Sequence, residues 1–321
     1  GVCILARLHP MHTPSPRVPP PRRAFFFKLF LLLTFAAVMT YISLVFANSR
    51  SSRRLATPLV RGLPTGKRAL GTSVRAVDKR VSIHPYFKVG DNLNAFKGAF
   101  GKFYDAVDKE KNCLYYGFSV DEQNAVVYNR ECYDSAEGLI KHIENTADVG
   151  NMVGHLFEDV QLQIHAPKEE LAKLEVVAKE IGAEMWELEE NGFVNDNMAK
   201  GPDTSVSIHP YFHIKPENWD KFVEILPQYS ERVKNEPDCQ MYTFSFNKEK
   251  GMVYNRESYK NADALLNHFD NTAPVNDIAG PYIDSVDLEI HGPEKELVKL
   301  VPWARENNAK LFIMDDKARV Y

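Results

Sequence analysis

Histidine and tyrosine alternate along one short segment whose side chains could transfer protons. Residues 81–87 read VSIHPYF, and the alternation of a strand places His84 and Tyr86 on one face. A free imidazole titrates near neutral pH, so His84 is a candidate base for removing a proton from a substrate. The same seven letters return at 206–212, which makes His209 a second candidate base.

A second repeated motif supplies arginine, asparagine and glutamate. Residues 127–131 read VYNRE and recur at 253–257. Polar side chains on a covered sheet face are costly unless they are hydrogen-bonded or solvated, which favours a ligand cavity. In that interpretation Arg130 and Arg256 join the two histidines as catalytic candidates, because guanidinium groups stabilise a developing oxyanion. The expected ligand-binding residues are Tyr86, Tyr116, Tyr128, Asn129, Glu131 and His142 in the first copy and Tyr211, Tyr242, Tyr254, Asn255, Glu257 and His268 in the second.

The second motif also has a purely structural explanation. Strand alternation turns Tyr128 and Arg130 to one face and Asn129 and Glu131 to the other, and either pair could line the cavity. Alternatively, Glu131, Arg130 and His142 form a buried polar network that pins the strand to the helix after it. Ordinary packing would equally explain the histidine and tyrosine of the first motif.

The spacing of the histidines predicts no metal site and no cofactor site. His209 and His213 on one strand would lie about 13 Å apart at a rise of about 3.3 Å per residue, too far to share an ion. His165 and His291 stand before an Ala-Pro and a Gly-Pro pair, respectively, at the end of a strand, where turn capping is the expected role. The chain has no glycine-rich phosphate loop and no nucleophile elbow.

Both motifs belong to two tandem copies of one domain. Matching stretches lie 125 residues apart at the first motif and 126 residues apart afterwards, which is the size of a small domain. We expect a leader over residues 1–80, domain copies at 81–190 and 206–321, and a polar, glycine-containing linker at 191–205.

Each copy has the pattern of an α+β, ferredoxin-like unit of strand, helix, strand, strand, helix and strand, with a further helix and strand appended. In the first copy we expect strands at 81–89, 114–120, 125–133, 159–165 and 183–189, and helices at 91–109, from 134 past 143, and at 169–181. Asp134 with Glu137 resembles a capping box, and Pro227 should kink the first helix of the second copy. A lone copy would leave one sheet face wet, so we expect the two sheets to close into one barrel, a pseudo-dimer within the chain.

The first 80 residues have the composition of a targeting leader. A basic stretch precedes the uncharged apolar run 29–47, and Ser, Thr and Arg dominate residues 48–80. The pattern predicts a plastid protein that carries a secretory-type bipartite leader. The alternative is a single-pass anchor, since the run is just long enough to span a bilayer. The protein would meet a membrane only if residues 29–47 are retained.

Charge is distributed unevenly along the chain. Residues 1–80 carry 14 Lys and Arg against a single acid, whereas residues 81–321 carry 25 Lys and Arg against 42 Asp and Glu. A body with a net charge of −17 is a poor nucleic-acid binder, because neutralising phosphates requires clustered basic side chains. Nucleic acid is therefore excluded as a partner.

A resemblance to a known family appears at the second motif. The residues that carry it are Glu131, Tyr133 and His142 in the first copy and Glu257, Tyr259 and His268 in the second. This pattern resembles the antibiotic-biosynthesis-monooxygenase-like family of dimeric α+β barrels, and it covers both copies but not the leader. The resemblance implies oxygenases without metal or flavin, in which polar side chains deprotonate the substrate before oxygen reacts.

Two functions remain open from the sequence. The first is a cofactor-independent oxygenase acting on a small aromatic or quinone-like substrate in the barrel cavity. The second is a non-catalytic module that binds a ligand or a protein, attached to a membrane assembly. Differences between the copies, such as Cys132 against Ser258, indicate that one cavity could have drifted while the other works.

Overall fold

The computed structural model describes residues 75–195 and 200–321. The expected leader lies outside the described residues, apart from residues 75–80. Within the described ranges, no helix is both long and apolar enough to cross a membrane. The apolar run 29–47, and with it the prediction of a signal or an anchor, lies outside those ranges.

The two copies contain the same succession of elements. The first copy has strands β2 (Val81–Lys88), β3 (Cys113–Asp121), β4 (Val126–Tyr133), β5 (Asp159–Ala166) and β6 (Glu184–Leu188), and helices α2 (Leu93–Lys97), α3 (Phe100–Val107), α4 (Ala136–Val153) and α5 (Lys168–Ile181). The second has strands β9 (Val206–Ile214), β10 (Cys239–Asn247), β11 (Met252–Tyr259), β12 (Ile283–Gly292) and β13 (Lys310–Met314), and helices α6 (Trp219–Val233), α7 (Ala262–Ala279) and α8 (Glu294–Glu306). The first helix region of copy one is split at Gly98, as expected of a residue with low helix propensity, whereas α6 is continuous.

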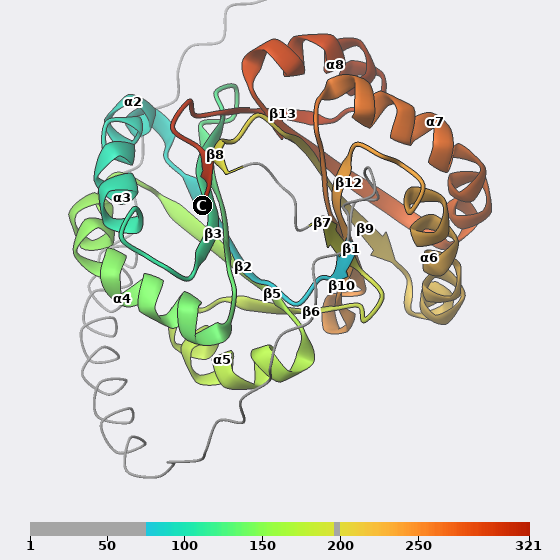
Figure 1. Ribbon diagram of the computed structural model, residues 1–321, viewed down its shortest axis with the longest axis horizontal. Helices are drawn as coiled ribbons and strands as arrows, with labels where there is room; N and C mark the ends of the chain where they lie inside the picture. The colour runs from blue at the N-terminus through green and yellow to red at the C-terminus, as the bar shows by residue number, and fades with distance from the viewer. Residues whose placement is uncertain (1–74, 196–199) are drawn as a thin grey trace, which may run out of the picture. The chain divides into compact units, whose positions relative to one another are not determined.

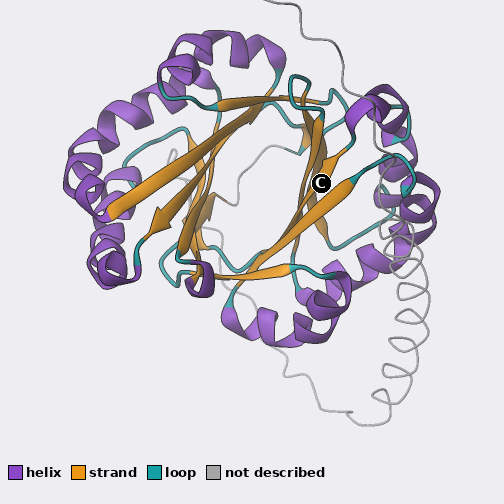
Figure 2. Ribbon diagram, turned by 180° about the vertical axis from the view of Figure 1, so that it is seen from behind, coloured by secondary structure: helices purple, strands orange, loops and turns teal. Residues whose placement is uncertain are grey.

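The strands close into one barrel, as expected. The order β10-β11-β9-β12-β13-β3-β4-β2-β5-β6 returns to β10. Closure depends on the last strand of each copy, since β13 pairs antiparallel with β3 and β6 pairs antiparallel with β10. The helices lie around the outside, those of copy one on one side and those of copy two on the other (Figures 1 and 2). The expectation of a mixed α+β barrel is confirmed.

Short strands outside the barrel form at the end of the expected leader and within the expected linker. Residues 75–80 were assigned to the leader, yet β1 (Arg75–Val77) pairs with β7 (Phe193–Asn195). The supposed linker likewise contains β7 and β8 (Gly201–Pro202), and β8 pairs with β14 (Arg319–Val320). The two three-strand edges β1-β7-β10 and β8-β14-β3 therefore mirror each other. The domain boundaries themselves stay predictions.

One helix begins differently from the expected capping box. Ser135, rather than Asp134, caps α4, because its hydroxyl accepts a hydrogen bond from the amide of Gly138. Asn261 caps α7 in the same way, accepting from the amide of Ala264. These caps fix the start of the helices that carry His142 and His268.

Candidate functional sites

A carboxylate–imidazole–carboxylate relay lies between the sheet and the helices of copy one. His142 on α4 contacts the Glu131 carboxylate on β4 through Nε2 at 2.9 Å and that of Glu110 through Nδ1 at 3.1 Å. Tyr133 donates to Glu131, and Asn129 donates to it at 3.0 Å. Burial alone would lower the pKa of His142, but the two carboxylates outweigh it and raise the pKa to about 9. His142 is therefore an imidazolium at neutral pH.

Copy two repeats the relay with Glu257, His268 and Glu236. The ring of His268 lies 3.3 Å from Glu257 and 3.1 Å from Glu236. Burial opposes charge on His268, but the two carboxylates raise its pKa. Burial is also the main reason that the pKa of Glu257 rises to about 7, although His268 and Tyr259 act in the opposite direction. A carboxylate with this pKa can take up and release a proton near neutral pH.

The relay of copy two opens onto a surface depression. The depression has a volume of about 540 Å³ and lies at the end of α6 beside α7. It is lined by Glu231, Arg232, Asn235, Glu236, Pro237, Asn267 and Asn271. Asn271 donates a hydrogen bond to Glu236 at 2.6 Å. Glu236 also contacts the ring of His268, and it therefore connects the depression to the relay. In copy one, Lys109, Lys111 and Lys141 occupy the positions of Asn235, Pro237 and Asn267.

A column of stacked rings fills the interior of the barrel. His84 stacks on His165 with centroids 4.3 Å apart, and His209 stacks on His291 at 4.2 Å. The two pairs face each other across 6.2 Å between His84 and His209. Trp186 and Phe312, which are equivalent residues of the two copies, close the ends. Burial first, and then neighbouring positive charge, lowers the pKa of all four histidines well below the usual value, so they are neutral.

A hydrogen-bonded chain crosses the barrel from one copy to the other. Glu289 accepts from Tyr86 at 2.9 Å, the hydroxyls of Tyr86 and Tyr211 lie 2.8 Å apart, and Tyr211 contacts the Gln163 amide at 2.9 Å. Each tyrosine hydroxyl has one proton to donate. If Tyr86 donates to the Glu289 carboxylate, Tyr211 must donate to Tyr86. The contact between Tyr211 and Gln163 is then a hydrogen bond only when the NH₂ group of Gln163 faces Tyr211. The hydrogen bonds therefore all point the same way, from the Gln163 amide to the Glu289 carboxylate.

Two buried arginines hold the copies together. Arg256 of copy two forms an ion pair with Asp78 and donates to Ser82 at 2.7 Å. Arg130 of copy one forms the equivalent ion pair with Asp203 and donates to Ser207 at 3.3 Å. The two arginines therefore stabilise the junction between copies, and the hydroxyl of each serine lies inside the barrel.

The expected ligand cavity in the barrel is not open. The void bounded by His84, His209, Arg130 and Arg256 has a volume of about 10 Å³, which is room for about one water molecule. Tyr86, Tyr128, Tyr211 and Tyr254 fill the remaining interior with their own rings. The structure therefore brings these expected ligand-binding residues together, but as a packed core.

Several positions differ from the expected ones. Tyr116 and Tyr242 were expected in the barrel, but they pack beside His142 and His268 on the helix side. Of the two alternatives on the second motif, Tyr128 and Arg130 face the interior, while Asn129 and Glu131 face the helices with their counterparts Asn255 and Glu257. Arg130 was expected in the network of Glu131, but alternation sends it to the other face. His165 and His291 were expected to cap turns, but each lies inside the barrel and contacts a serine of the other copy.

Sequence reasoning missed the acidic residues that contact the relay histidines and those that contact the barrel interior. Glu110 and Glu236 precede the second strand of each copy in loops with no distinctive motif, and only their equal offset in the two copies could have flagged them. Asp78 was hidden in the presumed leader. Glu289 and His291 alternate along one strand, a spacing that could have indicated a shared face with His209.

Comparison with solved structures finds several proteins that are similar to this chain. It is 34% identical to MupZ from Pseudomonas fluorescens, covering 92% of that protein and 35% of this chain, with a TM-score of 0.33. A candidate monooxygenase from Fusobacterium nucleatum is 16% identical over 66% of this chain and 90% of its own, with a TM-score of 0.49. An anthrone oxidase-like protein is 10% identical over 68% of this chain and 92% of its own, with a TM-score of 0.41.

No protein-family model matches the chain, and neither does any curated protein. The identity to MupZ over nearly all of that protein is at the level of shared family membership. The repeated E-x-Y and histidine motif lies at equivalent positions of both copies. The chain therefore belongs to the antibiotic-biosynthesis-monooxygenase-like family, as a tandem duplication.

Proposed function

We propose that the protein is an oxygenase of small hydroxylated aromatic compounds and that its reaction takes place at the copy-two depression rather than inside the barrel. The observation that carries the proposal is the position of Glu236, which lines a depression of about 540 Å³ and contacts His268. The barrel interior holds only about 10 Å³ of free volume, too little for an aromatic ring. The polar lining suits a substrate with hydroxyl groups.

The relay supplies a base and a place to store the proton. Glu236 would take a proton from the acidic carbon or hydroxyl of the substrate, which leaves an electron-rich anion that reacts with oxygen. His268 would pass a proton on to Glu257, whose pKa of about 7 lets it accept one at neutral pH. Arg232 lines the same depression and would stabilise the negative charge on the substrate.

The name of one similar structure suggests the probe. One similar structure is an anthrone oxidase-like protein, and an anthrone fits the proposed chemistry. Removal of a proton from its methylene carbon, followed by reaction with one O₂, would give the anthraquinone and one water. Such a reaction needs no metal or flavin from the protein.

The test compares matched variants of the two copies. Oxygen consumption and quinone formation would be followed with anthrone and related phenols, above the spontaneous rate. Glu236→Gln should lower the rate by about 100-fold or more, the usual contribution of a general base. Glu110→Gln changes the same position of copy one and should leave most of the rate intact. Equal losses in both variants, or no oxidation by the unchanged protein, would contradict the proposal.

A non-catalytic ligand-binding module is the second candidate. The packed barrel interior favours it, because the four histidines there are neutral, buried and without room for a substrate beside them. This function predicts that an aromatic ligand binds at the depression without consuming oxygen. Binding would be weakened by Asn267→Lys, which installs the copy-one residue, and titration calorimetry would measure it.

A further inference from the structure

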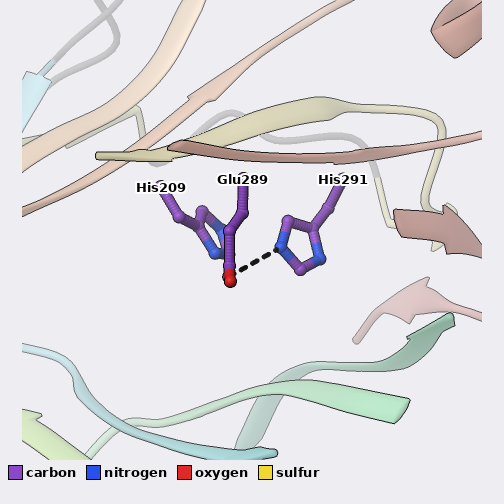
Figure 3. Close-up of side chains that lie close together, drawn as sticks. All are labelled: His209, Glu289 and His291. Atoms are coloured by element: carbon purple, nitrogen blue, oxygen red, sulfur yellow. Dashed lines mark ion pairs between the residues drawn. The ribbon is translucent and has the colours of Figure 1, made fainter. Parts of the chain in front are cut away.

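Two histidines and a glutamate converge on one point inside the barrel. His209 on β9 is the direct cross-strand neighbour of Glu289 on β12, and His291 follows on the same face. Figure 3 shows the three side chains projecting from the two strands to the same side. One ligand atom from each lies within 4.8 Å of the others, and all three residues are buried.

The imidazoles present nitrogen atoms that no other group uses. The Nδ1 atom of His291 contacts the Ser119 hydroxyl at 2.6 Å, which turns Nε2 toward Glu289 at 3.7 Å. That Nε2 atom is buried and has no hydrogen-bond partner among the described residues, and the same holds for Nδ1 of His209. A histidine whose one nitrogen is held by a hydroxyl and whose other nitrogen is unused has the arrangement of a metal ligand with its outer-shell partner.

We propose that His209, Glu289 and His291 bind one divalent transition-metal ion of the zinc type. Two imidazole nitrogens and one carboxylate oxygen suit zinc and its neighbours rather than calcium or magnesium, which prefer oxygen ligands. Tetrahedral coordination needs ligand atoms about 3.3 Å apart. Movements of about 1 Å in the three side chains would bring their ligand atoms from the present separation to that distance. Three protein ligands leave a fourth position for water. The site is separate from the depression, so the inference does not depend on the proposed function.

The remaining contacts of Glu289 are compatible with an ion. Tyr86 donates to Glu289 Oε2 at 2.9 Å, as outer-shell partners of ligating carboxylates do. Lys310 lies 3.5 Å from Oε1 and competes for the carboxylate, but its side chain is half exposed and can turn to solvent. Binding would therefore displace one lysine contact and retain the tyrosine contact.

Copy one provides a built-in control. The equivalent residues are His84, His165 and Gln163, and the two imidazoles stack in the same way. The only change in the ligand set is a neutral amide in place of the carboxylate, and an amide is a weak ligand for zinc. The inference therefore predicts one ion per chain, bound by copy two.

The experiment measures metal stoichiometry and affinity on the full 321-residue chain. After treatment with a chelator, Zn²⁺ would be titrated against a chromophoric competitor, and Co²⁺ would serve as a spectroscopic probe of four-coordinate nitrogen and oxygen ligation. One equivalent should bind. Glu289→Gln, which reproduces the residue of copy one and is close in shape, should weaken binding by more than the 10–100-fold typical of outer-shell changes.

The reverse substitution keeps the test informative if a ligand variant folds poorly. Gln163→Glu should create a second site and raise the stoichiometry from one to two ions per chain. An unchanged affinity in Glu289→Gln would overturn the proposal, and so would a failure of the unchanged protein to bind. A stoichiometry that stays at one in Gln163→Glu would show that His, Glu and His in this geometry are not the ligand set.

Discussion

At the scale of single residues, the most unusual feature is a buried histidine held between two carboxylates. The His142 ring is contacted by Glu131 from β4 and by Glu110 from the loop before β3, and Tyr116 and Tyr133 pack against it. In copy one, an imidazolium and two carboxyl groups are thereby taken out of water. Such a group is stable only while the imidazolium persists, because a neutral ring would leave two carboxylates close together.

This arrangement makes stability depend on pH. The pKa of His142 is about 9 in the folded chain and near 6.5 when unfolded, so its contribution is fully present below pH 6.5 and is lost as the pH rises through 9. We expect His142 to contribute about 3 kcal/mol to the free energy of unfolding at pH 6 and little at pH 9.5. Urea midpoints of the unchanged chain and His142→Gln should converge across this range. A constant difference between the two would disprove the charged relay.

At the scale of elements, most strands and helices of the barrel follow from sequence periodicity. The repeated copies helped, because each predicted element recurs in the other copy at an offset of 125 or 126 residues. Alternation shows that Tyr128 and Glu131 lie on opposite faces of the strand, but it does not show which face is turned to the barrel interior and which to the helices. Periodicity also missed β1 and β8, because strands of two or three residues are too short to show a pattern.

The residues that follow the short strand β1 contribute to the buried contacts of the barrel. Asp78, directly after β1, pairs with the buried Arg256 of copy two. Asp78→Asn would leave that guanidinium without its carboxylate, and we expect a loss of about 3–5 kcal/mol in unfolding free energy. Lys79→Ala, at the exposed neighbouring position, is the control and should change stability by less than about 0.5 kcal/mol. Chemical denaturation compares the two, and a loss below about 1 kcal/mol in Asp78→Asn would mean that the ion pair with Arg256 contributes little to stability.

At the scale of the whole barrel, neither copy pairs all of its strands or its buried arginine by itself. The edge strand β3 is paired by β13, and β10 is paired by β6. Each buried arginine reaches an aspartate that lies just before the opposite copy. The hydrogen bonds that run from Glu289 through Tyr86 and Tyr211 to Gln163 join residues that belong alternately to copy two and copy one. The contacts that close the barrel are therefore shared by the two copies.

This sharing predicts that the two copies unfold as one unit. Leu174 on α5 and Leu300 on α8 are equivalent, fully buried residues of copies one and two. Leu174→Ala should lower the unfolding free energy by about 2–5 kcal/mol, and Leu300→Ala should do the same. Because losing either sheet exposes the edges and buried arginines of the other, each variant should keep a single denaturation transition. Hydrogen exchange followed by mass spectrometry should then show equal loss of protection in core peptides of both copies. Protection lost only in the substituted copy would instead mean that the barrel is two independently folding halves in contact.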